Sequence, residues 1–177
     1  MQELEPIKPV KAKELYLETR EGEVSEKTLQ GYHYRLKHFV RWCGKNGIDN
    51  MNNLSGRDIH EYKLWRKKDG NLKPITLKGQ LDALKIFLQW CESVDAVREG
   101  LHDKIVYPTL SKKEEVSDEK IGGEEAEKIL GYLRQFEYAS RKHILFSILW
   151  HTGIRMGSMY ALDVGDYYPD EKYLELV

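Results

Sequence analysis

Apolar side chains in the first half of the chain recur every three or four residues, which is the spacing of one face of an α-helix. Helix-start signals precede these stretches: Pro9 suits a first helical turn, and Ser25 and Ser55 stand as N-cap residues. Asp58 follows Ser55 by three residues, the spacing of a capping box. The pattern predicts four helices, over residues 9–20, 25–45, 55–66 and 74–93.

Two of these helices carry long apolar stripes, so we expect them to form the centre of a core. The stripe of the second helix consists of Leu29, Tyr32, Leu36, Phe39, Val40 and Cys43. The main stripe of the fourth helix consists of Leu77, Leu81, Leu84, Leu88 and Cys91. Ile86 and Trp90 lie on another side of the fourth helix, which predicts packing on two faces. Both cysteines fall on the stripes and are interpreted as small apolar core residues.

The pattern changes in the second half of the chain. Residues 111–119 are charged and almost without large apolar side chains, which indicates an interdomain linker. Helical periodicity returns over 123–135 and 140–152, a short helix follows Gly153, and the last six residues alternate as in a β-strand. No second strand pattern is visible to pair with it, so we expect the chain to end part-way through a truncated fold. The predicted organisation is mainly α-helical: a four-helix domain over 1–106, a linker over 107–122, and the helical start of a second domain with one terminal strand over 123–177.

Composition narrows the class of protein but does not indicate a partner. With 41% hydrophobic and 32% charged residues, the chain can form a packed core. No apolar run approaches the ~18 residues of a membrane span, and the N-terminus lacks the apolar region of a secretory signal. Two cysteines are too few for a disulfide scaffold. We therefore expect a cytoplasmic protein in a reducing compartment, without a membrane partner.

Positive charge gathers in one block of the sequence. Residues 25–90 contain 13 Lys and Arg against 6 Asp and Glu, although the whole chain has a net charge of −1. Basic side chains neutralise DNA phosphates, and a missing side chain lets a backbone approach closely. A solvated lysine-rich face is the alternative explanation. The outward face of the second helix carries the candidate DNA contacts Lys27, Tyr34, His38, Arg41 and Lys45, with Gly31 beside Tyr34.

The fourth helix carries a second group of candidate DNA contacts. Lys73 precedes the helix, Thr76 offers a hydroxyl at its start, and Lys78 and Lys85 follow on one flank. A plain N-cap is the alternative role for Thr76. A glycine inside a helix, as Gly79 would be, lowers helix stability by about 1 kcal/mol relative to alanine. Either close approach of another backbone or helix packing would explain why glycine stands at this position. The sequence has no metal-ligand spacing and no phosphate-binding glycine loop, so we expect no metal, no cofactor and no small-molecule substrate.

The segment from Thr152 to Asp166, TGIRMGSMYALDVGD, holds the most specific candidate. One helix ends at its first residues, and Arg155 opens a short helix with Met159 and Leu162 facing inward. An arginine at such a junction is expected to be partly buried and to need a negatively charged partner. From the residues alone, that partner is either an external anion or an internal acid.

T-G-x-R followed by A-L-D-V and an aspartate resembles the first arginine motif of tyrosine site-specific recombinases, of the lambda-integrase and Xer type. The upstream half resembles the SAM-like core-binding domain of the same family, in which a helix patterned T-L-x-x-Y-x-x-x-L-x-x-F recurs. That pattern matches Thr28, Leu29, Tyr32, Leu36 and Phe39, and a following Thr-led helix with spaced leucines matches Thr76 to Leu88. The resemblance covers nearly the whole chain and implies a DNA-binding helical domain followed by the start of a catalytic domain.

In that family the first arginine contacts the scissile phosphate, so the resemblance implies this role for Arg155. Ser158 stands where family members often carry an acidic residue, which makes Asp163 the candidate to orient Arg155 instead. The family's hairpin lysine, H-x-x-R pair and tyrosine nucleophile would all follow the terminal strand and are not in this chain. The string from His38 to Arg41 matches H-x-x-R only in letters, because it lies upstream and its two middle residues belong to the core stripe.

The resulting interpretation is the DNA-binding portion of a tyrosine recombinase or integrase that does not cleave DNA as this chain. Its expected partners are double-stranded DNA and further recombinase copies on that DNA. The alternatives are a non-enzymatic DNA-binding protein derived from an integrase and a helical protein–protein adaptor. A steep loss of DNA binding with salt would exclude the adaptor.

Overall fold

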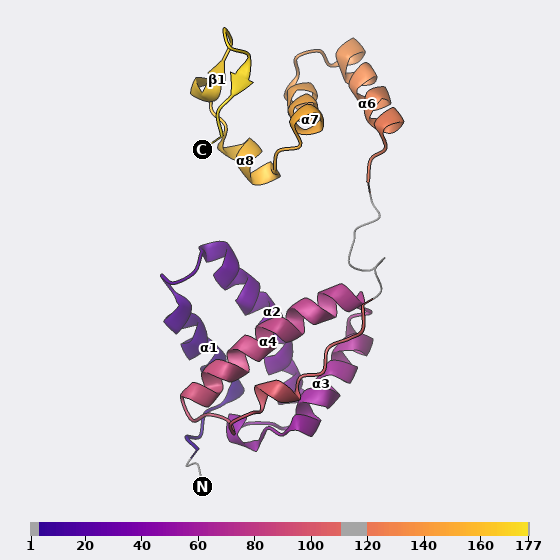
Figure 1. The fold of residues 1–177 in the computed structure, drawn as a ribbon. Helices are drawn as coiled ribbons and strands as arrows, with labels where there is room; N and C mark the ends of the chain where they lie inside the picture. The colour runs from indigo at the N-terminus through magenta and orange to yellow at the C-terminus, as the bar shows by residue number, and fades with distance from the viewer. Residues whose placement is uncertain (1–3, 111–119, 177) are drawn as a thin grey trace. The chain divides into compact units, whose positions relative to one another are not determined.

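The computed structural model describes residues 4–110 and 120–176. The chain divides into two compact units, Met1–Ser117 (unit 1) and Asp118–Val177 (unit 2), and both are mainly helical (Figure 1). This confirms the mainly α-helical class predicted from the sequence. The predicted linker segment 111–119 lies outside the described residues, and the domain boundaries at 106 and 123 stay predictions.

Unit 1 contains the four predicted helices at the predicted places. Two short 3-10 turns, η1 (Met51–Asn53) and η2 (His102–Lys104), follow α2 and α4 respectively. The four helices are α1 (Pro9–Arg20), α2 (Glu26–Lys45), α3 (Gly56–Asp69) and α4 (Pro74–Ser93).

Two of these helices begin with the caps that the sequence indicates. The Ser25 hydroxyl accepts the backbone N–H of Thr28 at 3.2 Å. Ser55 and Asp58 form the predicted capping box, in which the Ser55 N–H donates to Asp58 Oδ2 at 2.8 Å. Each such cap satisfies a backbone donor that the helix leaves unpaired, which typically contributes about 1 kcal/mol.

The connection between α3 and α4 differs from the sequence-based expectation. The sequence pattern predicts that the third helix ends at residue 66, but α3 continues to Asp69, so Lys67 and Lys68 belong to its last turn. Pro74 is the first residue of α4 and Lys73 occupies the N-cap position without a side-chain cap. Thr76 therefore lies in the first turn of α4 and is not its N-cap.

The core of unit 1 forms where the apolar stripes of α2 and α4 meet. The fully buried Phe39 and Phe87 come from these two helices, and Tyr16 of α1 packs on Phe87 with 5.4 Å between ring centroids. Each such side chain contributes roughly 1.5–3 kcal/mol through burial. Cys43 and Cys91 are fully buried in the same core, as predicted, and burial raises the pKa of the Cys43 thiol to about 12.

A charged hydrogen-bond cluster holds η2 against the end of α4. His102 Nδ1 lies 2.8 Å from Glu92 Oε1, and the backbone N–H groups of Gly100 and His102 donate to the Glu92 carboxylate at 3.2 and 2.9 Å. Burial alone would raise the pKa of Glu92, but these hydrogen bonds and the nearby imidazole bring it below its ordinary value. The carboxylate thus stabilises the turn that follows α4.

Unit 2 begins with the helices that the periodicity predicts. Ser140 caps one of them by accepting the His143 N–H at 3.2 Å, and Gly153 ends it at φ +66°, a conformation that favours glycine. The helical elements are α6 (Gly123–Phe136), α7 (Arg141–Thr152), α8 (Met156–Ala161) and the 3-10 turn η3 (Val164–Asp166).

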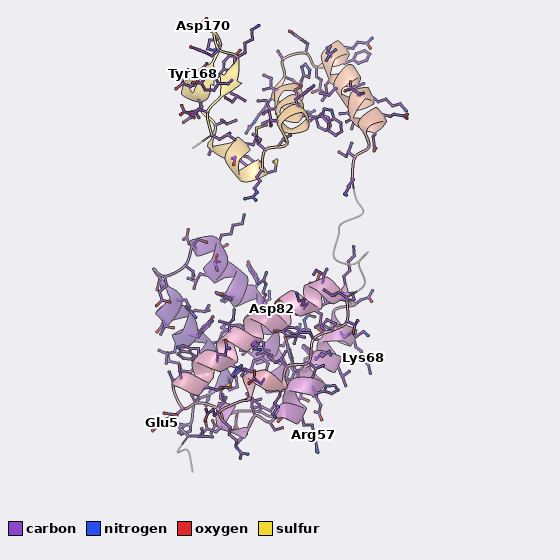
Figure 2. The ribbon with its side chains drawn as sticks, viewed as in Figure 1. Glu5, Arg57, Lys68, Asp82, Tyr168 and Asp170 are labelled. Carbon is purple, nitrogen blue, oxygen red and sulfur yellow. The ribbon has the colours of Figure 1, made fainter. Side chains whose placement is uncertain are left out.

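The described part of unit 2 ends in a two-stranded hairpin. β1 (Tyr167–Tyr168), which contains the Tyr168 labelled in Figure 2, pairs antiparallel with β2 (Tyr173–Leu174). The rings of Tyr168 and Tyr173 stack with 4.5 Å between their centroids. The terminal strand was predicted, but the expectation that it lacks a partner is wrong. A two-residue strand is too short to show alternation, and Lys172 closes the turn at φ +58°.

Unit 2 buries few of its described side chains. Ala126, Leu130, Leu133 and Met159 are buried, and α7 contributes none. Large apolar residues stay exposed, including Phe136 at 64%. These exposed residues do not form a membrane helix, because no helix in the described ranges is both long and apolar enough to span a bilayer.

Candidate nucleic-acid interface

One side of α2 presents the candidate DNA contacts to solvent. Tyr34 is 59% exposed, and Lys37 Nζ lies 4.7 Å from its ring centroid, although the sequence did not single out Lys37. His38 is half-buried, whereas the other members are exposed. We name this set of five residues the α2 basic face: Lys27, Tyr34, His38, Arg41 and Lys45.

A buried arginine connects the α2 basic face to the two neighbouring helices. The side chain of Arg66 in α3 is 7% exposed, and its Nε donates to Gln80 Oε1 of α4 at 2.8 Å. Arg66 Nη1 also lies 3.5 Å from Asp69 Oδ2, which accepts a hydrogen bond from Arg41 Nη2. This chain of contacts links α2, α3 and α4, so the position of Arg41 is fixed by the packing of three helices.

The indole of Trp65 supports two of the basic side chains. Arg41 Cζ lies 5.0 Å and Lys45 Nζ 5.5 Å from the Trp65 ring centroid. Cations are attracted to the negative face of an aromatic ring. Arg41 is thus held by Asp69 and by Trp65, while 47% of its side chain remains exposed. The Arg41 guanidinium is therefore already ordered before any ligand binds.

His38 contributes a neutral group rather than a positive charge at pH 7. Burial lowers the pKa of His38 below its ordinary value. The positive charges of Arg66, Arg41 and Lys37 lower it further, and Asp69 only partly opposes them. The ordinary pKa of histidine is about 6.5, so at pH 7 the imidazole offers one hydrogen-bond donor and one acceptor.

The four candidates on α4 separate into two groups. Lys73 and Thr76 are exposed at the start of the helix, with Thr76 one turn before the buried Gln80. Lys78 and Lys85 are half-buried. Asp82, labelled on α4 in Figure 2, interrupts their flank. Lys85 Nζ lies 3.6 Å from Asp103 Oδ1 of η2, so part of its charge is balanced inside unit 1.

Two interior glycines face open space in unit 1. A Cβ placed at Gly31 of α2 or at Gly79 of α4 would meet no described atom within 4 Å. Helix packing was one of two explanations for Gly79, and these distances remove it for the described part of the chain. Both helices would accept alanine without a clash.

Arg155 is placed differently from the sequence-based expectation. It is the N-cap residue of α8 and is exposed, and its side chain makes no ion pair with a described residue. Partial burial was wrong because α8 has only six residues and its inward position is filled by Met159. Asp163, the candidate to orient it, instead shares a capping box with Asp166, whose Oδ2 accepts the Asp163 N–H at 2.7 Å.

Comparison with known proteins places unit 1 in a family. The family model of the phage integrase N-terminal SAM-like domain matches residues 13–96. The N-terminal domain of a phage integrase/site-specific recombinase from Haloarcula marismortui is 32% identical, covering 59% of this chain and 99% of that one, with a TM-score of 0.57. The chain belongs to the phage integrase family. The resemblance inferred from the sequence motifs is thereby confirmed.

The integrase-like fold also includes unit 2. The Tn1549 transposon integrase, whose structure was solved with circular intermediate DNA, matches 97% of this integrase chain with a TM-score of 0.65. Its sequence is 16% identical, so the match shows a shared fold alone. The present chain spans 54% of the Tn1549 integrase chain in that structure. Comparison with curated proteins gives no match.

Sequence reasoning about this integrase missed the contribution of α3. Arg66 was placed only as the last residue of the predicted third helix and given no role, although it follows Ile59 and Tyr62 at the spacing i, i+3, i+7 of one buried helical stripe. An arginine on an apolar stripe is the signal that would have identified it. Across the described ranges, no cluster of three or more His, Cys, Asp or Glu could hold a metal ion.

Proposed function

We propose that unit 1 of this integrase binds double-stranded DNA through the α2 basic face and the start of α4. The observation that carries the proposal is Arg41, an exposed guanidinium ordered by Asp69 and by the ring of Trp65. Preordering lowers the side-chain entropy lost on binding. Family membership supports the proposal, as does the DNA present in the Tn1549 integrase structure.

The chemistry of the face suits a phosphate backbone. Lys27, Arg41 and Lys45 supply positive charge, and neutral His38 and the Tyr34 hydroxyl supply hydrogen-bonding groups. At the start of α4, Lys73 and Thr76 accompany a helix N-terminus, which favours an anion, and Lys78 and Lys85 add charge on its flank. Such contacts position a protein on DNA without reading its sequence.

We propose for the complete recombinase that Arg155 contacts the scissile phosphate during strand exchange. Its exposed guanidinium makes no ion pair with a described side chain and so keeps its donors for a phosphate, which it can bind bidentately. We expect this chain to bind DNA without cleaving it, because neither an H-x-x-R pair nor a tyrosine stands in the family's context after Arg155. Further recombinase copies on the DNA are the expected protein partners.

Salt-dependent binding tests the DNA-binding proposal. Lys27→Ala, Arg41→Ala and Lys78→Ala should each weaken binding to unrelated duplexes and lower the slope of log K against log salt by about one unit, measured by fluorescence anisotropy. Lys11→Ala is the matched control, because Lys11 is an exposed α1 residue paired with Glu14. If a variant that combines these three substitutions binds DNA as tightly as the wild type at low salt, the proposal is contradicted.

A nicked suicide duplex tests the cleavage proposal. Neither this chain nor its Arg155→Ala variant should form a covalent DNA adduct on denaturing gels. Arg155→Ala should also leave DNA affinity nearly unchanged, because a transition-state contact contributes little to ground-state binding. An adduct formed by this chain would refute the claim that it is unable to cleave.

A further inference from the structure

Gly31 occupies an interior position of α2 on the side of the α2 basic face. Lys27 lies four residues before it and Tyr34 three residues after it, so both are its neighbours on the helix surface. Glycine is the least favourable helix-interior residue apart from proline. The position thus carries a stability cost in the middle of the surface proposed to meet DNA.

The fold of unit 1 gives no reason for glycine at this position. A Cβ at Gly31 would meet no described atom within 4 Å, and its φ is not in the left-handed region. The neighbouring Tyr34 is 59% exposed, with Lys37 against its ring and no part of the described core covering it. The open space at Gly31 therefore lies beside an exposed aromatic side chain and an exposed lysine.

We propose that Gly31 is the point at which α2 approaches the DNA backbone most closely. The missing side chain lets a sugar–phosphate strand lie against the helix between Lys27 and Tyr34, within reach of the lysine ammonium and the phenol. A methyl group there would hold the strand away from the helix and lengthen both contacts. This inference rests on the proposed DNA binding of unit 1 and assigns a specific role to a residue without a side chain.

Replacing Gly31 with alanine should have opposite effects on stability and binding. Gly31→Ala should raise the thermal midpoint of the full chain by about 4 °C, because alanine favours the helix. The same variant should bind duplex DNA about tenfold more weakly, the equivalent of one charge-assisted hydrogen bond. Gly31→Leu should bind more weakly still, because a larger side chain displaces the strand further.

Gly44→Ala is the matched control on the same helix. A Cβ at Gly44 would also meet nothing within 4 Å, but Gly44 lines a hollow between the end of α2 and the start of α1, away from the basic face. Gly44→Ala should therefore raise the thermal midpoint to a similar extent and leave the affinity for DNA unchanged.

Three results would overturn the inference: unchanged DNA affinity in Gly31→Ala, equal loss in Gly31→Ala and Gly44→Ala, or a lower thermal midpoint in Gly31→Ala. If Lys27→Ala weakens binding while Gly31→Ala does not, the role of Gly31 fails and the proposed function stands. If the wild type shows no salt-dependent binding, both fail together.

Discussion

Replacing Arg66 with methionine isolates the buried polar contact between α3 and α4. Methionine retains a long apolar side chain but removes the guanidinium, so Gln80 Oε1 loses the donor that lies 2.8 Å away. Gln80 is only 8% exposed, so water reaches the vacated acceptor poorly. An unpaired buried acceptor costs about 1–3 kcal/mol. We expect Arg66→Met to lower the free energy of unfolding by about 2 kcal/mol.

The double variant Arg66→Met/Gln80→Leu separates the cost of an unpaired acceptor from a loss of packing. Replacing both polar partners with apolar groups of similar size is often close to neutral. Burying methionine also removes the cost of desolvating a charge, which offsets the lost contact with Asp69. The double variant should therefore recover about 1 kcal/mol or more of the stability lost in Arg66→Met.

Urea denaturation of the full chain, followed by tryptophan fluorescence, measures both changes. Trp42, Trp65 and Trp90 lie in unit 1 and report its unfolding, whereas Trp150 lies in unit 2. With a slope of about 2 kcal/mol per molar urea, the expected loss moves the midpoint by about 1 M. The reasoning is refuted if Arg66→Met changes the free energy of unfolding by less than about 0.5 kcal/mol, or if the double variant is no more stable than Arg66→Met.

The remaining predictions concern titrating groups. Burial alone would raise the pKa of Glu92, but hydrogen bonds from His102 bring it below its ordinary value. The stability that Glu92 contributes is therefore present above the unfolded pKa of about 4.3 and is lost as pH falls through the lowered pKa. Glu92→Gln should lose less stability than the wild type on acidification, measured by circular dichroism. Burial lowers the pKa of His38, so the folded state binds a proton there less readily than the unfolded state does. The wild type should therefore lose stability as pH falls from the unfolded pKa of about 6.5 through the lowered folded pKa. The thermal midpoints of His38→Gln at pH 7 and pH 5 should differ by less than those of the wild type. Burial raises the thiol pKa values, so Cys43 and Cys91 should react with a thiol reagent only on unfolding.

The helices of unit 1 were predictable because their signals are local. The caps at Ser25 and Ser55 act within one turn and form as expected. The α2 stripe is confirmed in part: Leu36, Phe39 and Cys43 are buried, but its other three members are only half-buried, and Trp42, which the stripe did not include, is buried as well. The partner strand β1 was not predictable, because its two residues are stabilised by a hairpin turn and by stacking of Tyr168 on Tyr173. Short elements that depend on a neighbour leave no periodic pattern in the sequence.

The candidate site was likewise predictable within single helices but not between them. Helical geometry alone places Lys27 and Arg41 on one face of α2, but the pairing of Arg41 with Asp69 joins residues 28 positions apart and depends on how the helices cross. The exposure of Arg155 was mispredicted for a related reason. A local motif identifies the residue type at a helix start but does not report how much of a core surrounds it.

The sparse burial in unit 2 has a calorimetric consequence. The heat-capacity increase on unfolding comes from apolar surface that becomes newly hydrated. Phe136 and Tyr160 of unit 2 are already hydrated when folded, whereas Phe39 and Phe87 of unit 1 are not. Unit 2 should therefore contribute a smaller increment per residue and a flatter stability curve with temperature. Cooling would weaken unit 1 more than unit 2, because the free energy gained by burying apolar surface becomes smaller as the temperature falls.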